Sequence, residues 1–262
     1  MAKPALKAAL LSPQRPLGDH PLLVVGPSLG TSTILWNRTA SVLGNDVDVV
    51  AWDLPGHGVS PAATGTFDVA ALADAVVDLV DSIAPGEAFH YAGVSLGGAT
   101  GLQLGIKHGE RLKSLSVQCS GAKLGTPEGW LERAETVRTQ GTGVMIQGSA
   151  QRWFAPGFIE REPRTATALL TTLQHADKDS YARVCEALGR ADLRPDLAGI
   201  SIPVLVMGGR HDAVVDPESQ QELAARIPDA SLVIVEDAAH LAPAESPTEV
   251  GEVLASWMAG LR

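Results

Sequence analysis

The chain has 262 residues, of which 45% are hydrophobic and 19% are charged, and its formal net charge is −10. This composition is typical of a globular protein with a large core and excludes a disordered chain. The excess of acidic residues, with no basic run that could neutralise phosphates, argues against nucleic acid and anionic membranes as partners.

Short apolar runs rich in β-branched residues recur along the chain and predict buried strands. Segments with helical spacing lie between them, so the pattern predicts an α/β fold with a mainly parallel, doubly wound sheet. Residues 5–11, ahead of the first run, are expected to add an antiparallel strand at one edge of this sheet. The expected buried strands cover residues 22–25, 47–52, 89–94, 112–117, 204–207 and 232–235.

This alternation stops in the middle of the chain, where only helical patterns occur. The patches cover residues 128–140, 144–154, 165–175 and 180–188. An all-helical insertion between two strands of one sheet predicts a helical cap over the carboxyl edge of the sheet, where open α/β sheets bind their ligands. We therefore expect a core formed by residues 1–121 and 196–262, and a helical cap formed by residues 122–195.

The sequence shows no pattern typical of a membrane segment or of a metal site. Lysines and a proline interrupt the apolar residues at positions 1–11, which does not fit a signal peptide, and no run approaches the ~18 apolar residues of a membrane span. Cys119 and Cys185 lie far apart and favour two free thiols in a reducing, cytoplasmic compartment. No cofactor or metal is expected, and the sequence leaves open whether the protein is a monomer or a homo-oligomer.

The sharpest chemical signal is Gly-Val-Ser-Leu-Gly-Gly at positions 93–98, between an expected strand and an expected helix at 96–107. A Gly-x-Ser-x-Gly sequence in that setting predicts a nucleophile elbow, a strained turn that exposes Ser95. The small flanking residues let strand and helix approach closely. The N–H of Leu96 is expected to point to the place where a carbonyl oxygen would become an oxyanion.

A serine nucleophile needs a base, which is itself oriented by an acid, and on this architecture the order along the chain is Ser, acid, His. Asp212 follows the apolar run 204–207, and His240 follows the run 232–235. Both residues are therefore expected on loops at the rim that also carries Ser95.

Other residues compete for these roles. Asp216 could be the acid, but it precedes Pro217 and fits the cap of the next helix better. Asp237 is too near His240 in sequence to be the first choice for the acid. His57 lies in the turn 53–58, which is expected to shape the floor of the site rather than to take part in the chemistry.

A second oxyanion donor is expected from the loop that follows the first apolar run. This loop reads Gly-Pro-Ser-Leu-Gly-Thr-Ser at positions 26–32, and the N–H of Leu29 is the candidate. Pro27 stands where many esterases carry histidine. An ordinary turn between strand and helix is the alternative interpretation of the loop.

The expected cap offers candidates for substrate contact. Trp130 and Arg133 are three residues apart on an expected helix and so share a face, and Arg152, Trp153 and Phe154 form a second cluster. An anionic substrate that approaches a protein of net charge −10 needs a local cation, which Arg133 could supply. The alternatives are a solvated arginine and aromatic side chains that belong to the core.

These motifs resemble those of the α/β-hydrolases over essentially the whole chain, and more narrowly those of the 3-oxoadipate enol-lactonases of aromatic-compound degradation. The resemblance implies a cofactor-independent serine hydrolase that opens 3-oxoadipate enol-lactone to 3-oxoadipate. It also implies a small-molecule lactone as the partner, bound by Trp130, Arg133 and Trp153. The segments that carry the resemblance are residues 26–31, 93–98, 128–133, 152–154 and 239–242.

Two other functions remain open at this point. The same fold and triad would serve a general carboxylesterase, a perhydrolase or a C–C hydrolase, and a preference for neutral esters would favour this group. A ligand-binding receptor on a hydrolase scaffold is the other possibility, against which the complete Ser-Asp-His set argues.

Overall fold

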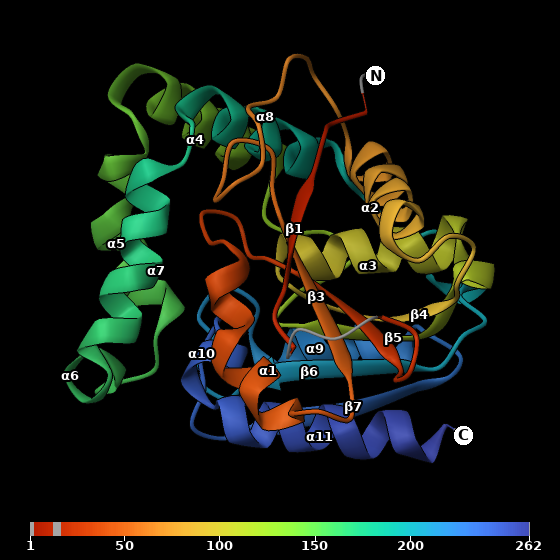
Figure 1. Ribbon diagram of the computed structural model, residues 1–262. Helices are drawn as coiled ribbons and strands as arrows, with labels where there is room; N and C mark the ends of the chain where they lie inside the picture. Colours follow the sequence, from red (N-terminus) through yellow and green to blue (C-terminus); the bar gives the residue numbers. More distant parts are fainter. Residues whose placement is uncertain (1–2, 13–16, 262) are drawn as a thin grey trace.

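The fold was derived from a computed structural model that describes residues 3–12 and 17–261. Residues 1–2, 13–16 and 262, which fall within the core predicted from the sequence, lie outside the described residues. The described part of the chain forms a seven-stranded sheet in the order β1-β3-β2-β4-β5-β6-β7 (Figure 1). Its strands are β1 (Lys7–Leu10), β2 (Leu22–Gly26), β3 (Asp48–Asp53), β4 (Phe89–Val94), β5 (Leu112–Gln118), β6 (Val204–Gly209) and β7 (Ala230–Val235).

The direction of the strands confirms the predicted sheet. β1 pairs antiparallel with β3 at one edge, and the other neighbouring strands all pair in parallel. β2, β3, β4 and β6 are buried at every position, because helices cover both faces of the sheet. Parallel strands place their carboxyl ends at one edge, so the loops that follow them gather there.

One strand departs from the expectation that every apolar run is buried. In β7, Ser231 and Leu232 are exposed and Val235 alone is fully buried. β7 is the last strand in the sheet order, so it has a neighbour on one side only. The apolar run therefore predicted the strand correctly, but the prediction that the strand is buried along its length was wrong.

Helices pack on both faces of the sheet. α1 contacts α11 below the sheet in Figure 1, and α2 contacts α3 above it. The side chain of Asp68 caps α2 by accepting a hydrogen bond from the Ala71 N–H at 2.7 Å. The elements outside the middle of the chain are η1 (Thr33–Trp36), α1 (Asn37–Leu43), α2 (Val69–Ile83), α3 (Leu96–Lys107), η2 (Gly109–Arg111), η4 (Leu197–Gly199), α9 (Pro217–Ala225), α10 (Ala242–Glu245) and α11 (Pro247–Gly260).

The described chain between β5 and β6 forms only helices, as predicted, and they lie to one side of the sheet (Figure 1, green to teal); they are called the cap below. α4 and α8 pack closely on each other. Both begin at a capping side chain, since Thr126 accepts from the Gly129 N–H and Asp177 from the Ser180 N–H. The cap consists of α4 (Pro127–Gln140), η3 (Thr142–Met145), α5 (Ile146–Trp153), α6 (Phe158–Arg161), α7 (Pro163–His175) and α8 (Lys178–Arg190).

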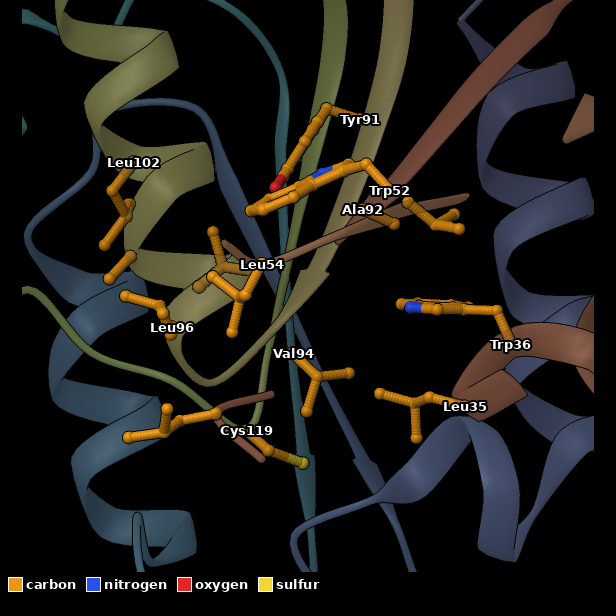
Figure 2. Close-up of a cluster of buried hydrophobic side chains, with 14 of the residues drawn as sticks. Leu35, Trp36, Trp52, Leu54, Tyr91, Ala92, Val94, Leu96, Leu102 and Cys119 are labelled. Carbon is orange, nitrogen blue, oxygen red and sulfur yellow. The ribbon is translucent and has the colours of Figure 1, made fainter. Parts of the chain in front are cut away.

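A continuous hydrophobic core underlies the carboxyl edge of the sheet. Val94 at the end of β4, Leu96 at the start of α3 and Cys119 just after β5 all contribute fully buried side chains (Figure 2). The backbone that carries the edge loops is therefore held by packing on its inner side. Among the described residues, no helix is both long and apolar enough to span a membrane.

Candidate active site

Ser95 occupies a strained turn between β4 and α3, as the sequence predicted. Its φ of 55° and ψ of −114° lie in a region that residues other than glycine rarely adopt. Its N–H donates to the Gln118 carbonyl at 2.9 Å, and its own carbonyl accepts from Ser120 Oγ at 2.5 Å. The end of β5 and the residues just after it thus hold the turn from both sides. Ser95 is buried but retains 8% of its exposure as a residue.

The glycines of the motif make this turn possible. A Cβ placed on Gly93 would lie 2.2 Å from the backbone C and O of Gly97, and one on Gly97 would lie 2.7 Å from the backbone C of Gly26. Such backbone atoms have no room to move aside. The first turn of α3 can approach β4 and β2 only because these positions carry no side chain.

We therefore expect Gly93→Ala to lower the free energy of unfolding by about 3 kcal/mol, since the added methyl group forces strand and helix apart. Urea unfolding measures this change. Gly109→Ala is the matched control, because nothing lies within 4 Å of a Cβ added there. Equal unfolding midpoints for the two variants would show that β4 and α3 do not need their close approach.

Asp212 and His240 form a buried pair on the loops after β6 and β7. His240 Nδ1 lies 3.0 Å from Asp212 Oδ2, and the two residues retain 2% and 4% of their exposure. Asp212 Oδ1 also accepts from the N–H groups of Val214 and Val215, at 2.8 and 3.1 Å. These bonds fix the direction of the carboxylate. With the proton held on Nδ1, the lone pair of His240 lies on Nε2 and is free to act as a base.

Asp216, the other candidate for the acid, caps a helix instead. The side chain of Asp216 accepts from the Ser219 N–H at 2.8 Å and caps α9, a bond that lowers the pKa of Asp216. Asp237 makes no hydrogen bond with His240 in the residues that the structure describes. Of the three carboxylates considered from the sequence, the structure brings only Asp212 against His240.

One contact links the loop of His240 to the segment that holds Ser95, and another links it to the cap. Cys119 Sγ lies 3.4 Å from the carbonyl oxygen of Ala239, and the residue before Cys119 accepts the Ser95 N–H. The N–H groups of His240 and Leu241 donate to the Trp153 carbonyl, at 3.2 and 3.3 Å. Within the described residues, Ser95 Oγ and His240 Nε2 are not joined by a hydrogen bond. Such bonds are often long before substrate binds.

The two candidate oxyanion donors lie on segments that touch. The Gly97 N–H donates to the Pro27 carbonyl at 2.9 Å, which ties the loop after β2 to the first turn of α3. Leu96 is the first residue of α3, so its N–H has no acceptor within the helix. The Leu29 N–H likewise has no acceptor in the described part of the chain. Both N–H groups are therefore available to a ligand oxygen.

The cap presents two guanidinium groups close together. Arg133 of α4 lies over the rings of Trp130 and Tyr181, 5.5 Å from each centroid, and donates a hydrogen bond to the Tyr181 hydroxyl. Desolvation, and then the charge of Arg133, lower the pKa of Arg152. Neither arginine forms an ion pair with a carboxylate of residues 3–12 or 17–261. Two neighbouring cations without an anion are a natural site for a negatively charged ligand.

The predicted aromatic contacts have different surroundings. The indole N–H of Trp130 donates to the Leu124 carbonyl at 2.6 Å, so this side chain can offer a ligand only its ring. The ring of Trp153 is buried against the loop after β2, since a Cβ on Gly30 would lie 3.3 Å from it. Trp153 thus borders the loop of Leu29 with its ring and the loop of His240 with its carbonyl.

Comparison with known proteins decides the family. The model of the alpha/beta hydrolase family matches residues 22–253. The chain belongs to the alpha/beta hydrolase family. Two enol-lactonases of Acinetobacter baylyi are among its curated relatives. 3-Oxoadipate enol-lactonase 2 is 37% identical, with 87% of this chain and 85% of the relative covered, and 3-oxoadipate enol-lactonase 1 is 31% identical, with 93% and 91% covered.

A solved structure agrees with the curated relatives. The enol-lactonase from Burkholderia xenovorans superposes with a TM-score of 0.88 at 31% identity, covering 98% of this chain and 95% of that chain. The resemblance to the 3-oxoadipate enol-lactonases within the alpha/beta hydrolases is confirmed, as is the predicted fold.

In this hydrolase, His57 packs where the cap meets the core. Its ring stacks on Tyr181 at 6.0 Å, its Nδ1 lies 3.0 Å from the Pro55 carbonyl oxygen, and burial lowers its pKa to about 4. A neutral histidine wedged against the cap fits the expected role in shaping the floor of the site. Sequence reasoning missed Tyr181, whose place depends on the packing of α8 on α4 and which no motif marks.

Proposed function

We propose that the protein is a serine hydrolase that opens 3-oxoadipate enol-lactone to 3-oxoadipate in aromatic-compound degradation. The observation that carries the proposal is the buried Asp212–His240 pair on the sheet edge that also holds the strained turn of Ser95. The names of the enol-lactonase relatives support the choice of lactone. Ser95, His240 and Asp212 are assigned as nucleophile, base and acid, with Leu29 and Leu96 as oxyanion donors.

The first half of the reaction opens the ring. Ser95 Oγ attacks the lactone carbonyl carbon while His240 Nε2 accepts the hydroxyl proton, and Asp212 stabilises the resulting imidazolium. The N–H groups of Leu29 and Leu96 bind the oxyanion, an effect worth about 3 kcal/mol for each donor. Collapse of the tetrahedral intermediate breaks the ring C–O bond. The departing enolate takes the proton from His240, and the enol becomes a ketone.

The second half releases the product. The opened chain remains bound to Ser95 as an acyl ester. His240 then takes a proton from water, the hydroxide adds to the acyl carbon, and the second tetrahedral intermediate expels Ser95 Oγ, which regains its proton from His240. Because an enol is a good leaving group, deacylation is expected to limit the rate.

The cap is assigned to substrate binding. We place the cap at residues 122–195 and the hydrolase core at residues 1–121 and 196–262, and the enzyme in the cytoplasm, where Cys119 and Cys185 would stay reduced. The pair of guanidiniums would bind the free carboxylate of the lactone, with Arg133 as the main contact and Arg152 beside it. Trp130 and Trp153 would pack on the lactone ring.

Arg133→Ala is expected to raise KM for the anionic lactone by about 10- to 100-fold, because a charge-assisted hydrogen bond to the carboxylate is lost. Steady-state kinetics with the lactone and with a neutral p-nitrophenyl ester measure the effect, and the ester rate shows that the variant is folded. Arg164→Ala, which removes the same charge from an exposed position on α7, is the control. An unchanged KM for the lactone in Arg133→Ala would rule out this carboxylate site.

A further inference from the structure

Glu245, at the end of α10, holds three backbone N–H groups from two distant segments. Its Oε1 accepts from Ala239 at 2.9 Å and from Leu241 at 3.2 Å, the two residues that flank His240. Its Oε2 accepts from Ala155 at 2.6 Å, two residues beyond the end of α5 in the cap. One carboxylate therefore binds both sides of the histidine and the end of a cap helix.

A second link runs parallel to this one. The N–H groups of His240 and Leu241 donate to the carbonyl of Trp153, the last residue of α5. Residues 153–155 are thus joined to the loop of His240 in two ways. The Trp153 carbonyl accepts hydrogen bonds from the loop directly, and Ala155 is connected to it through the carboxylate of Glu245. A displacement of the end of α5 would move the backbone of His240 with it.

We propose that Glu245 is a positioning residue, which in its ionised form fixes the backbone of His240 for proton transfer and couples it to the end of α5. The proposal deepens the hydrolase function and rests on it. Glu245 does not touch the reacting atoms. It acts through the direction of the imidazole, and a misplacement of about 1 Å in a catalytic group can cost a large factor in rate.

The ionised form matters because a carboxylate offers acceptors alone, whereas a protonated carboxyl group carries one O–H donor and is a weaker acceptor. Burial raises the pKa of Glu245 to about 7, against the opposing effect of the three N–H groups and of the charge of His240. Above pH 7 the carboxylate predominates. As the pH falls below 7, a proton turns one oxygen into a donor and weakens the bonds on that side.

Solvent can reach this carboxylate. Glu245 is half-buried and borders an open surface cavity of about 380 Å³ together with Arg161 of α6, His211 after β6 and Asp237 after β7. On the inner side it faces His240 and Cys119. The charge of His240 lowers the pKa of Glu245, and the charge of Glu245 raises the pKa of Cys119. Protons can therefore exchange with solvent without passing through the active site.

The test uses a probe that needs the nucleophile but not the lactone site. A p-nitrophenyl phosphonate ester phosphonylates Ser95: Ser95 Oγ forms a bond to phosphorus and p-nitrophenol leaves. The rate follows the ability of His240 to take the serine proton. We expect Glu245→Gln to lower this rate roughly tenfold or more at pH 8. The ratio of wild-type to variant rate should fall towards one at pH 6, where Glu245 of the wild type is protonated.

Glu249→Gln is the matched control, since it removes the same charge from an exposed position on α11 and should keep the ratio at one at both pH values. A ratio of one at pH 8 for Glu245→Gln, or a ratio that is the same at pH 8 and pH 6, would overturn the proposal. If wild-type protein fails to react while Ser95→Ala behaves identically, the hydrolase assignment itself fails.

A second measurement needs no variant. In the wild-type protein, the ¹³C resonance of the Glu245 carboxyl group and the N–H resonances of Ala155, Ala239 and Leu241 are expected to shift together with a common midpoint near pH 7. Separate midpoints, or N–H resonances that ignore the carboxyl titration, would show that Glu245 does not join the two segments.

Discussion

Ser95→Ala is expected to lower kcat for ester hydrolysis by about a million-fold, with little change in KM. In the proposed mechanism, the substitution removes the atom that forms the acyl intermediate, whereas the N–H groups of Leu29 and Leu96 and the cap would remain to bind substrate. The turn tolerates alanine as well as serine, because neither side chain is larger than the space that Ser95 occupies. Initial rates with a p-nitrophenyl ester measure the loss.

Ser231→Ala is the control, because it makes the same substitution at an exposed position of β7. This variant should retain the wild-type rate. Substantial turnover by Ser95→Ala, confirmed with protein free of wild-type enzyme, would mean that another group carries the nucleophilic attack. In that case the strained conformation of Ser95 would need a different explanation.

Asp212→Asn is expected to lower kcat by about ten thousand-fold. The amide N–H₂ of asparagine can donate to His240 Nδ1, which drives the imidazole proton to Nε2 and removes the lone pair that must accept the serine proton. The variant should fold, because the amide oxygen can still accept from the N–H groups of Val214 and Val215. Rates with the ester, together with thermal unfolding, measure both effects.

Asp216→Asn makes this test specific. It changes the neighbouring carboxylate in the same way, and asparagine caps a helix as well as aspartate does, so its kcat should stay near the wild-type value. If Asp216→Asn instead lost activity while Asp212→Asn kept it, the acid would have been assigned to the wrong residue.

The sequence predicted those parts of the molecule that depend on local pattern. Apolar runs located the parallel strands, the Gly-x-Ser-x-Gly motif located the turn of Ser95, and the order of strands placed Asp212 and His240 on one edge. Pro217, which follows Asp216, indicated that Asp216 caps a helix and that Asp212 is the better candidate for the acid. These features require only that a residue type stand at a given distance from a strand end, which a sequence displays directly.

Features that depend on the packing of distant segments were not predictable. Tyr181 meets Arg133 because α8 packs on α4, and Glu245 reaches Ala155 across 90 positions of the chain. No periodicity marks either residue. The helical patch expected at 144–154 is also divided, since Met145 ends η3 and α5 begins at Ile146. Glycines at 141 and 143 weaken the helix ahead of that point.

The recognition of an anionic lactone by this hydrolase can be measured by comparing kcat/KM for 3-oxoadipate enol-lactone with kcat/KM for the methyl ester of the same lactone. The two compounds share the reacting ring and differ only in the charge that Arg133 and Arg152 would bind. We predict that the acid is preferred by about 30-fold or more, and that Arg133→Ala removes most of the preference. An equal or higher kcat/KM for the methyl ester would contradict the lactonase assignment and leave a hydrolase of neutral esters.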